Sequence, residues 1–469
     1  MANPLAALLL SVESTTYGSP TETGERSAKR ARKSAGGSDA NGDLRMTFVG
    51  GRHAFEFNMT PKRDFIHETN VPFEKPKEIA VCSRDKDGVW TSDASAISKY
   101  SPPNCEGDYC DLKRGYERWQ HEELGRAELT FEPVMQAVWD AAFPSRAGAA
   151  AATSGTPLPP AAPTDPGAFP ANVVMWRGQM SKLLCAPYST REDWEMSVYA
   201  VDGVVYIDAR ETEACQRRKV TPTATQRLST YQGYKFESYC TDQPRESSVN
   251  TKPGVAYCSV ATTEIGGLRL ILAGEVDCYS AEPAADNYME LKTSKIFSRD
   301  NVHARENFEK NKLLKYWAQS YTVGVPRVVV GFRTDNGIVK KVQRFYTTQI
   351  PRMVQGREDE MWDARICLGF AYRVLAWISH VVLASDPAKD AAAAGAASGS
   401  AAPGPHEAPD QSQCWLLRFE GDDSTRLTLQ IDHPRKAHHI YAATRVYEAV
   451  KPQHAASLAS SEGGAAAIS

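Results

Sequence analysis

The sequence predicts a mixed α/β (α+β) fold, with a mixed sheet flanked by helices, from three observations. Large apolar side chains recur every three or four residues over 223–239 and 307–321, which is typical of helices. Segments rich in Leu, Ile and Val at 268–279 and 327–332 are typical of strands. An Asp-Asn-Gly sequence at 335–337 is a strong hairpin turn signal. Helices and strands therefore alternate in the central part of the chain.

Each central element has its own pattern. In the first helix Leu228, Tyr231 and Lys235 lie at helical spacing, and in the second an apolar stripe includes Trp317. A tryptophan can stack on an RNA base, but on such a stripe we expect it in the core. The expected elements are helix 223–239, strands 268–279 and 288–293, helix 307–321, strands 327–332 and 337–345, and a buried helix at 361–384.

The chain is expected to fold as one large domain with two insertions. Ala, Pro and Gly supply 18 of the 27 residues of 144–170 and 17 of the 28 residues of 385–412. Such stretches cannot offset the entropy of ordering them. Residues 414–432 are typical of two short strands around a Gly-Asp-Asp turn, and an isolated hairpin is marginal, so it should complete a sheet begun upstream. The prediction is a domain at 45–452, interrupted at 144–170 and 385–412, with tails at 1–44 and 453–469.

Composition excludes several classes of protein. Lys plus Arg number 54 and Asp plus Glu 57, and this net charge of −3 argues against a protein that coats nucleic acid, though not against a local basic groove. No apolar run approaches the roughly 18 residues of a membrane span, so no membrane partner is expected. The ten cysteines are scattered without a Cys-x-x-Cys pair, which predicts reduced thiols rather than a zinc site.

Acidic residues follow and interrupt the strand-like segments. Glu275 and Asp277 alternate with apolar residues and are expected on one face of strand 268–279, with Glu290 and Lys292 sharing a face of the next. Antiparallel pairing through a short loop would bring the four together. Three hard oxygen donors beside an ammonium suit one or two magnesium ions bound with phosphate. The alternative is an exposed hairpin of ordinary surface charges.

The order Asp, thirteen residues to Glu290, then x-Lys is similar to the core of the PD-(D/E)xK nucleases, with Val276 where Pro is frequent. Three further segments supply polar groups. GYKFES supplies Glu237, MWRGQMSKLL supplies Arg177, whose planar guanidinium suits phosphate, and KLLKYWAQS supplies Gln319.

The combination of WRG, GYKFE, GEVD, ELK and KLLKYWAQS in this order resembles the DXO family of RNA 5′-end decapping nucleases, which includes the fungal partner of the nuclear 5′→3′ exoribonuclease. The resemblance begins at FEKPKEIAVCSRD (73–85), continues through SKYSPPN and DLKRGYERW, and extends to GVPRVVVGFR (324–333). It therefore covers nearly all of the chain that is expected to fold.

The resemblance implies a role for each matching residue. The side chains of Glu237, Glu275, Asp277 and Glu290, with the Leu291 carbonyl, would bind two Mg²⁺ or Mn²⁺ ions. Lys292 and Gln319 match the family's active-site Lys and Gln. Trp176, Arg177 and Gly178 match the motif that meets the RNA 5′ end, and Cys258 matches a residue that lines the substrate site. Gly88 stands where the family often has Arg, which puts one RNA contact in doubt.

The expected function is a divalent-metal-dependent hydrolase of RNA 5′ ends. The resemblance implies removal of pyrophosphate from triphosphate ends and release of incomplete GpppN caps or NAD-type caps, with 5′→3′ exoribonuclease activity in some members. A DNA-acting nuclease on the same core, and a non-catalytic stabilising partner of a nuclear 5′→3′ exoribonuclease, remain alternatives. Four cations at 29–33 suggest nuclear localisation, although a solvated linker or a cytoplasmic protein would also carry such a run.

Overall fold

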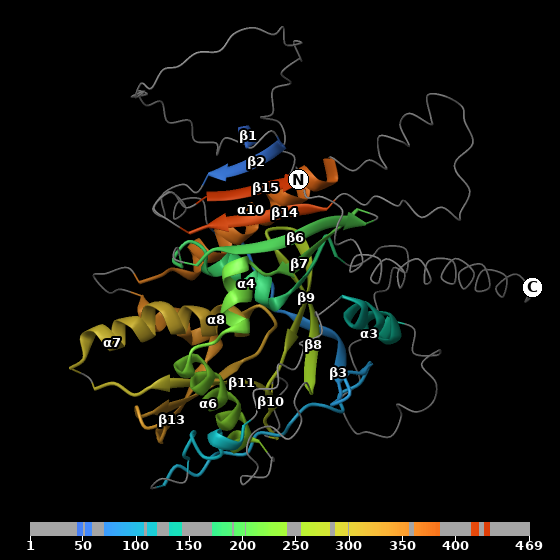
Figure 1. Cartoon of the computed structure of the whole chain (residues 1–469). Helices are drawn as coiled ribbons and strands as arrows, with labels where there is room; N and C mark the ends of the chain where they lie inside the picture. The colour runs from blue at the N-terminus through green and yellow to red at the C-terminus, as the bar shows by residue number, and fades with distance from the viewer. Residues whose placement is uncertain are drawn as a thin grey trace, which may run out of the picture. The chain divides into compact units, whose positions relative to one another are not determined.

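The computed structural model describes the larger structural unit of the chain, Gly42–Ser469, in parts (Figure 1). The tails at 1–44 and 453–469 and the insertions at 144–170 and 385–412 lie outside the described residues, as does the basic run at 29–33. The described residues are 45–49, 52–58, 70–106, 110–119, 131–142, 171–189, 192–201, 203–241, 255–281, 287–298, 300–355, 361–384, 414–421 and 426–431.

A mixed sheet of eleven strands forms the larger of two sheets in the described part of the chain. Only β5 runs parallel to its neighbours, β7 and β9, among these described pairings. In spatial order the strands are β1 (Arg45–Val49), β2 (Arg52–Asn58), β15 (Arg426–Ile431), β14 (Trp415–Glu420), β6 (Trp194–Val201), β7 (Val204–Arg210), β5 (Val173–Trp176), β9 (Leu268–Glu275), β8 (Ala256–Ile265), β3 (Lys77–Arg84) and β4 (Trp90–Thr91).

The parallel pairing of β5 with β9 has a direct consequence for the site. The carboxyl ends of parallel strands lie at the same edge of a sheet, and Trp176 at the end of β5 is aligned with Ala273 of β9. Arg177, which follows β5, is therefore brought beside the end of β9 that carries Glu275. The two residues are 98 positions apart in the chain (275 − 177).

A second, four-stranded sheet holds the other half of the site. Its strands, in spatial order, are β10 (Cys278–Tyr279), β11 (Tyr288–Lys295), β12 (Arg327–Arg333) and β13 (Val339–Tyr346). β11 and β12 are parallel, whereas β10–β11 and β12–β13 are antiparallel. The turn between β12 and β13 contains Gly337 at φ 88°, a conformation that glycine adopts without strain.

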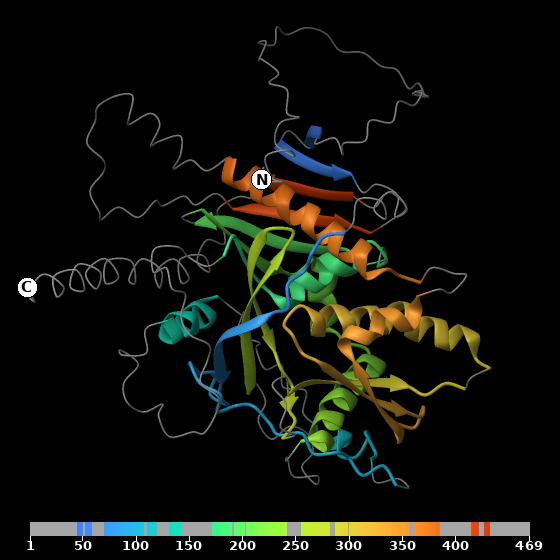
Figure 2. The same cartoon turned by 180° about the vertical axis from the view of Figure 1, so that it is seen from behind.

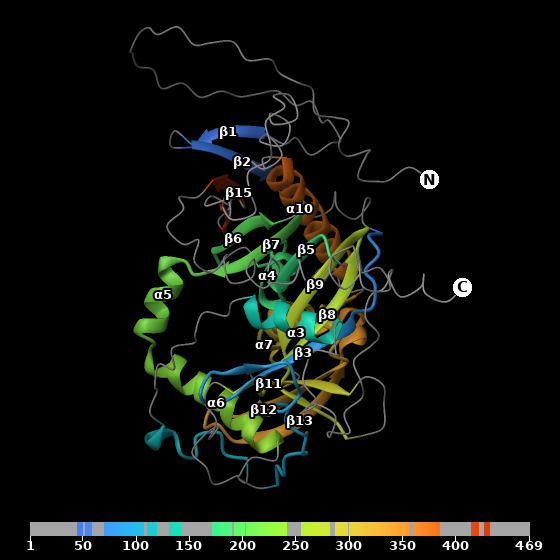
Figure 3. The ribbon, with the colours of Figure 1, turned by 90° about the vertical axis from the view of Figure 1, so that its right-hand side faces the viewer.

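Helices join the two sheets. α4 (Arg177–Cys185) packs on β5, β7 and β9 and also contacts α8 (Leu313–Tyr321) and α10 (Ala364–Ala384), while α8 contacts β12. α6 (Ala224–Cys240) packs on β11, as the side view shows (Figure 3). The other helical segments are α3 (Glu132–Ala142), α5 (Glu213–Val220), α7 (Val302–Asn307), α9 (Ile350–Val354), the 3₁₀ turns Tyr116–Arg118 and Thr347–Gln349, and a π turn at Phe308–Lys312.

The local sequence explains where two of these helices form. A capping box starts α6, because the Thr223 hydroxyl accepts from the Gln226 amide and the Gln226 side chain accepts from the Thr223 amide. α10 is long and apolar enough to cross a membrane by length and composition, but 72% of its most apolar window is buried in the fold. It lies across β6 and β7, seen from behind in Figure 2, as the core helix of a globular domain does.

Most predicted elements are confirmed. The helix expected at 223–239 is α6, the strand at 288–293 is β11, and the buried helix at 361–384 is α10. The hairpin around the Asp-Asn-Gly turn is β12–β13. The C-terminal hairpin completes the large sheet as expected, since β14 pairs with β6. Trp317 is a core residue, 1% exposed.

Two predicted elements are wrong in detail. The strand expected at 268–279 ends at Glu275 and resumes at Cys278, and the two parts belong to different sheets. Only the short β10 pairs with β11, so Glu275 and Asp277 do not share a face of one strand. The helix expected at 307–321 begins earlier, as α7, and is interrupted by the π turn before α8. The first departure occurs where the chain passes from the large sheet to the small one.

Candidate active site

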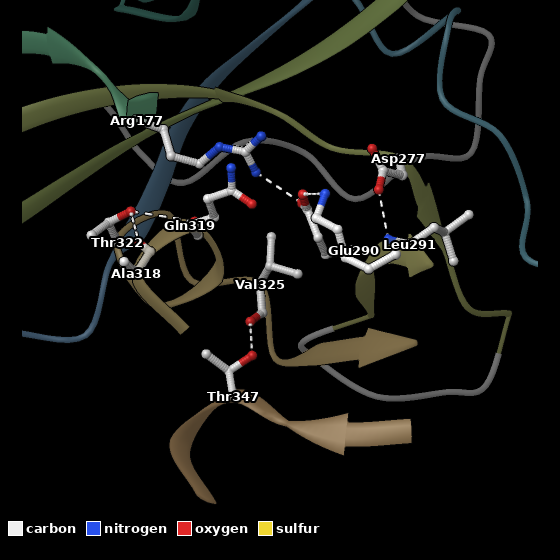
Figure 4. Close-up of polar contacts among 10 residues, drawn as sticks. Arg177, Asp277, Glu290, Leu291, Ala318, Gln319, Thr322, Val325 and Thr347 are labelled. Carbon is white, nitrogen blue, oxygen red and sulfur yellow. Dashed lines mark hydrogen bonds and ion pairs between the residues drawn. The ribbon is translucent and has the colours of Figure 1, made fainter. Parts of the chain in front are cut away.

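The site lies where β9 leaves the large sheet and β11 begins in the small one (Figure 4). The connection is short. Asp277, in the link between β9 and β10, accepts a 2.6 Å hydrogen bond at Oδ2 from the backbone amide of Leu291. This bond joins the β9–β10 link to β11 next to Glu290, although Asp277 and Leu291 are 14 positions apart in the chain. The carboxylates of the two strands are thereby held at one corner.

Glu290 is the most buried carboxylate of the site, with its side chain 1% exposed. One oxygen, Oε2, accepts from Nη1 of Arg177 at 2.9 Å, and the other, Oε1, accepts from Nζ of Lys292 at 2.5 Å. Glu290 and Lys292 share a face of β11, as the alternation of side chains along a strand predicts. The predicted acid–lysine pair is present, and Arg177 joins it from α4.

Charge compensation controls the protonation of Glu290. Burial would raise its pKa, but Arg177 and Lys292 together lower the pKa of Glu290 to about 2. Burial would likewise lower the pKa of Lys292, but Glu290 and Asp277 raise it above the ordinary value. Glu290, Lys292 and Arg177 therefore all remain charged at neutral pH.

Asp277 and Glu237 are compensated less, because Lys292 lowers the pKa of each without offsetting burial. Burial, with Glu290 as the next cause, raises the pKa of Asp277 to about 7. Burial and then the charge of Asp277 raise the pKa of Glu237 well above its ordinary value. Glu275, exposed at the end of β9, contributes to both shifts. Four carboxylates thus lie beside two cations, and without a further cation the protonated forms of Asp277 and Glu237 are favoured.

The remaining predicted residues lie around this cluster. Figure 4 shows Gln319 pointing from α8 toward the Arg177–Glu290 pair. Cys258 is aligned with Glu275 across β8 and β9 and is 2% exposed, which makes it a wall residue. Gly178 is the second residue of α4, directly after Arg177.

Trp176 has a different place from its RNA-facing prediction. It is 7% exposed and stacks on Phe131, with ring centroids 6.0 Å apart and an interplanar angle of 16°. Its indole therefore contributes to the core beneath Arg177. Gly88 lies in the β3–β4 turn at φ 82°, so an arginine at this position would be strained; the guanidinium of Arg84 lies beside it.

Two glycines that the sequence did not single out determine the geometry of the site. A Cβ on Gly274 would lie 3.0 Å from Cδ of Arg177, so the missing side chain gives that arginine its path across β9. A Cβ on Gly331 of β12 would lie 2.4 Å from the ring of Phe236, which precedes Glu237 on α6. The only sequence signal for either is a glycine inside a strand, where it often marks a close approach.

The donor set fits a hard divalent cation. Its members are carboxylate oxygens, which such cations prefer, and burial followed by neighbouring negative charge raises the pKa of Asp277 and of Glu237, a cost to ionisation that a bound cation would offset. Within the described residues, no three His, Cys, Asp or Glu side chains already stand at metal-ligand spacing. Glu290 is held by Arg177 and Lys292 instead.

The fold and the site define a nuclease of the PD-(D/E)XK class, a hydrolase with a carboxylate cluster and a lysine at the corner of a mixed sheet. The chain belongs to the RAI1-like PD-(D/E)XK nuclease family, whose family model matches residues 74–444. It is 31% identical over 341 residues to the decapping and exoribonuclease protein of Homo sapiens, which covers 70% of this chain and 80% of that protein.

Two further similarities agree. Over 226 residues the chain is 39% identical to the decapping and exoribonuclease protein of Xenopus laevis, which corresponds to 46% of this chain and 55% of that protein. The crystal structure of S. pombe Rai1 in complex with 3′-FADP is similar with a TM-score of 0.52 and 26% identity, covering 78% of this chain and 96% of that one. The family resemblance, the mixed fold and the nuclease class expected from the sequence are confirmed.

Proposed function

We propose that this chain is a divalent-metal-dependent decapping nuclease that hydrolyses phosphoanhydride bonds at RNA 5′ ends. The observation that carries the proposal is the cluster of Glu237, Glu275, Asp277 and Glu290 with Arg177 and Lys292 in a chain of this family. The relatives' names describe decapping and exoribonuclease activity. The S. pombe complex with 3′-FADP supports nucleotide-type caps among the substrates.

We assign two divalent ions, Mg²⁺ or Mn²⁺, to the four carboxylates and the Leu291 carbonyl. When bound, such ions lower the pKa of a water molecule and neutralise phosphate charge. Within the described structure Arg177 uses Nη1 for Glu290, and its other N–H groups remain for phosphate oxygens of the 5′ end. Lys292 keeps its charge beside the same carboxylates, and Gln319 positions the substrate or water.

The test uses one RNA prepared with four 5′ ends: monophosphate, triphosphate, GpppN cap and NAD cap. Products are resolved by end group and at single-nucleotide level, with Mg²⁺ or Mn²⁺. Release of pyrophosphate or of an intact cap is expected from the wild-type protein and not from Glu275→Ala or Asp277→Ala. Circular dichroism checks that both variants remain folded. Near-wild-type turnover in both variants would refute the assignment of the carboxylates.

The same assay separates the alternatives. Equal cleavage of matched 5′-phosphorylated RNA and DNA would favour a DNA-acting nuclease. A chain that cleaves none of the ends, yet is retained by a nuclear 5′→3′ exoribonuclease, would instead be its stabilising partner. We propose nuclear localisation from the basic run at 29–33. A fluorescent fusion that stays nuclear after the four cations are replaced by Ala would refute that assignment.

A further inference from the structure

A chain of hydrogen bonds lies beside the carboxylate cluster and includes none of its members. The hydroxyl of Tyr288, on β11, donates to Oε2 of Glu78 on β3 at 2.8 Å. Because that uses the only hydroxyl hydrogen of Tyr288, its 2.5 Å contact with the hydroxyl of Tyr257 must be donated by Tyr257, on β8. Ser259 donates to the same Glu78 oxygen at 2.6 Å. The chain therefore has one direction, from Tyr257 through Tyr288 to Glu78.

These bonds connect the two sheets. β3 and β8 belong to the eleven-stranded sheet and β11 to the four-stranded sheet. Tyr257 and Ser259 are 4% and 1% exposed, so the bonds form away from competing water. Glu78 and Tyr288 are 210 positions apart in the chain, and their contact is a purely tertiary link.

Both ends of the link are attached to residues that carry the cluster. The carbonyl of Tyr257 accepts a 2.9 Å hydrogen bond from the amide of Val276, which lies between Glu275 and Asp277. Tyr288 precedes Glu290 by two residues on the same face of β11. Tyr257 thus holds the acids of the large sheet through its backbone and the strand of Glu290 through its side chain.

We propose that Tyr257, Tyr288 and Glu78 are positioning residues that set the separation of the carboxylates on the two sheets, and so the affinity of the site for its divalent cation. This inference rests on the proposed function. Asp277 spans the corner through the Leu291 amide, beside the pairing of Cys278 with Met289 and the ion pair of Arg177 with Glu290. The tyrosine link adds a buried attachment at the start of β11, which fixes that end of the strand against β3 and β8.

Loss of the link should weaken metal binding more than RNA binding. Hydrogen bonds that orient ligands from outside the ligand set typically contribute about 10- to 100-fold to metal affinity or activity. The carboxylates and Arg177 remain in Tyr257→Phe and Tyr288→Phe, so the Michaelis constant for RNA should change less than about twofold. Because the two tyrosines act as one chain, their effects should not add.

The experiment compares wild type, Tyr257→Phe, Tyr288→Phe, the double variant and Tyr231→Phe. Tyr231 is a matched control, since its hydroxyl donates to the Arg114 carbonyl and it lies six residues before Glu237 on α6, outside the tyrosine link. Binding of Mn²⁺ to each protein is measured by calorimetry, and the Mn²⁺ dependence of decapping is measured alongside. Each single variant is expected to bind Mn²⁺ about tenfold more weakly, with the double variant no worse and Tyr231→Phe unchanged.

Several outcomes would overturn the proposal. Unchanged Mn²⁺ affinity in both tyrosine variants would do so, as would additive losses or an equal loss in Tyr231→Phe. A raised Michaelis constant for RNA with normal Mn²⁺ affinity would make the tyrosines substrate contacts instead. Calorimetry needs no turnover, so an inactive wild-type protein that binds Mn²⁺ would contradict the proposed function and still test the link.

Discussion

Replacing Gly331 by Ala tests how the small sheet positions Glu237. The added Cβ would lie 2.4 Å, 2.7 Å and 2.9 Å from three ring atoms of Phe236. Carbon atoms at their best contact are about 3.5 Å apart, so the nearest atom must move by about 1 Å (3.5 − 2.4). Phe236 is 0% exposed, and its ring has no route into solvent. The ring must leave its rotamer, or α6 must lift from β12.

Either response has a calculable consequence. Overpacking of this kind costs about 1–3 kcal/mol of unfolding free energy. Glu237 is the next residue on α6, so a helix lifted by up to about 1 Å misplaces one carboxylate of the site, a displacement that costs about 100-fold in rate. We expect Gly331→Ala to fold with reduced stability and to lose about 100-fold in decapping rate at saturating Mn²⁺.

The assay combines urea unfolding with single-turnover decapping of triphosphate RNA. Gly233→Ala is the matched control, because it adds the same methyl group to α6 where no atom lies within 4 Å. It should keep its activity and gain up to about 1 kcal/mol of helix stability. Phe236→Leu combined with Gly331→Ala should recover part of the lost stability. Wild-type activity in a destabilised Gly331→Ala would refute the link to Glu237, and wild-type stability would refute the steric argument itself.

Two further predictions follow from the same corner. Gly274→Ala places a Cβ 3.0 Å from Cδ of Arg177 and 3.0 Å from Cγ1 of Val323. Because Arg177 is tied to Glu290, its guanidinium should shift, and the Michaelis constant for a 5′-triphosphate RNA should rise about tenfold while the dissociation constant for the metal stays unchanged. An unaltered Michaelis constant would show that the Arg177 side chain moves aside without cost. In metal-free protein the pKa of Asp277 is raised to about 7, from a value near 3.8 in the unfolded chain, so folding favours the protonated carboxyl. The contribution of Asp277 to stability is therefore complete below about pH 4 and is lost as the pH rises through about 7. Binding of Mn²⁺ at pH 6 should therefore release protons, so the calorimetric binding enthalpy should depend on the ionisation enthalpy of the buffer. This dependence should be weaker in Asp277→Asn. A binding enthalpy that does not change with the buffer would contradict the raised pKa.

Local chemistry accounts for most of what the chain shows before folding. The capping box at Thr223 and the Asp-Asn-Gly turn act within a few residues, and the hairpin at that turn formed as expected. The pairing of Glu290 with Lys292 follows from alternation along one strand. Residue types and spacing therefore predict the cluster of Glu275, Asp277, Glu290 and Lys292, whereas the roles of Glu237 and Arg177 are implied by the family resemblance.

Contacts between distant segments decided the rest. A strand pattern runs through Glu275 to Cys278 without any signal that the two halves enter different sheets, because only the partners β8 and β11 impose the break. The ion pair of Arg177 with Glu290 spans 113 positions. Burial raises the pKa of both acids, but the contacting cations Arg177 and Lys292 bring the pKa of Glu290 below its ordinary value, whereas the pKa of Asp277 stays raised.

The tyrosine link shows the same division. Nothing near Glu78, Tyr257 or Tyr288 in the chain distinguishes them from ordinary strand residues, and each acquires its partner only when β3, β8 and β11 meet. Residue type and spacing specify which groups can perform the chemistry. Their separation and their charge depend on how the two sheets pack, because hydrogen bonding and desolvation act across space and not along the chain.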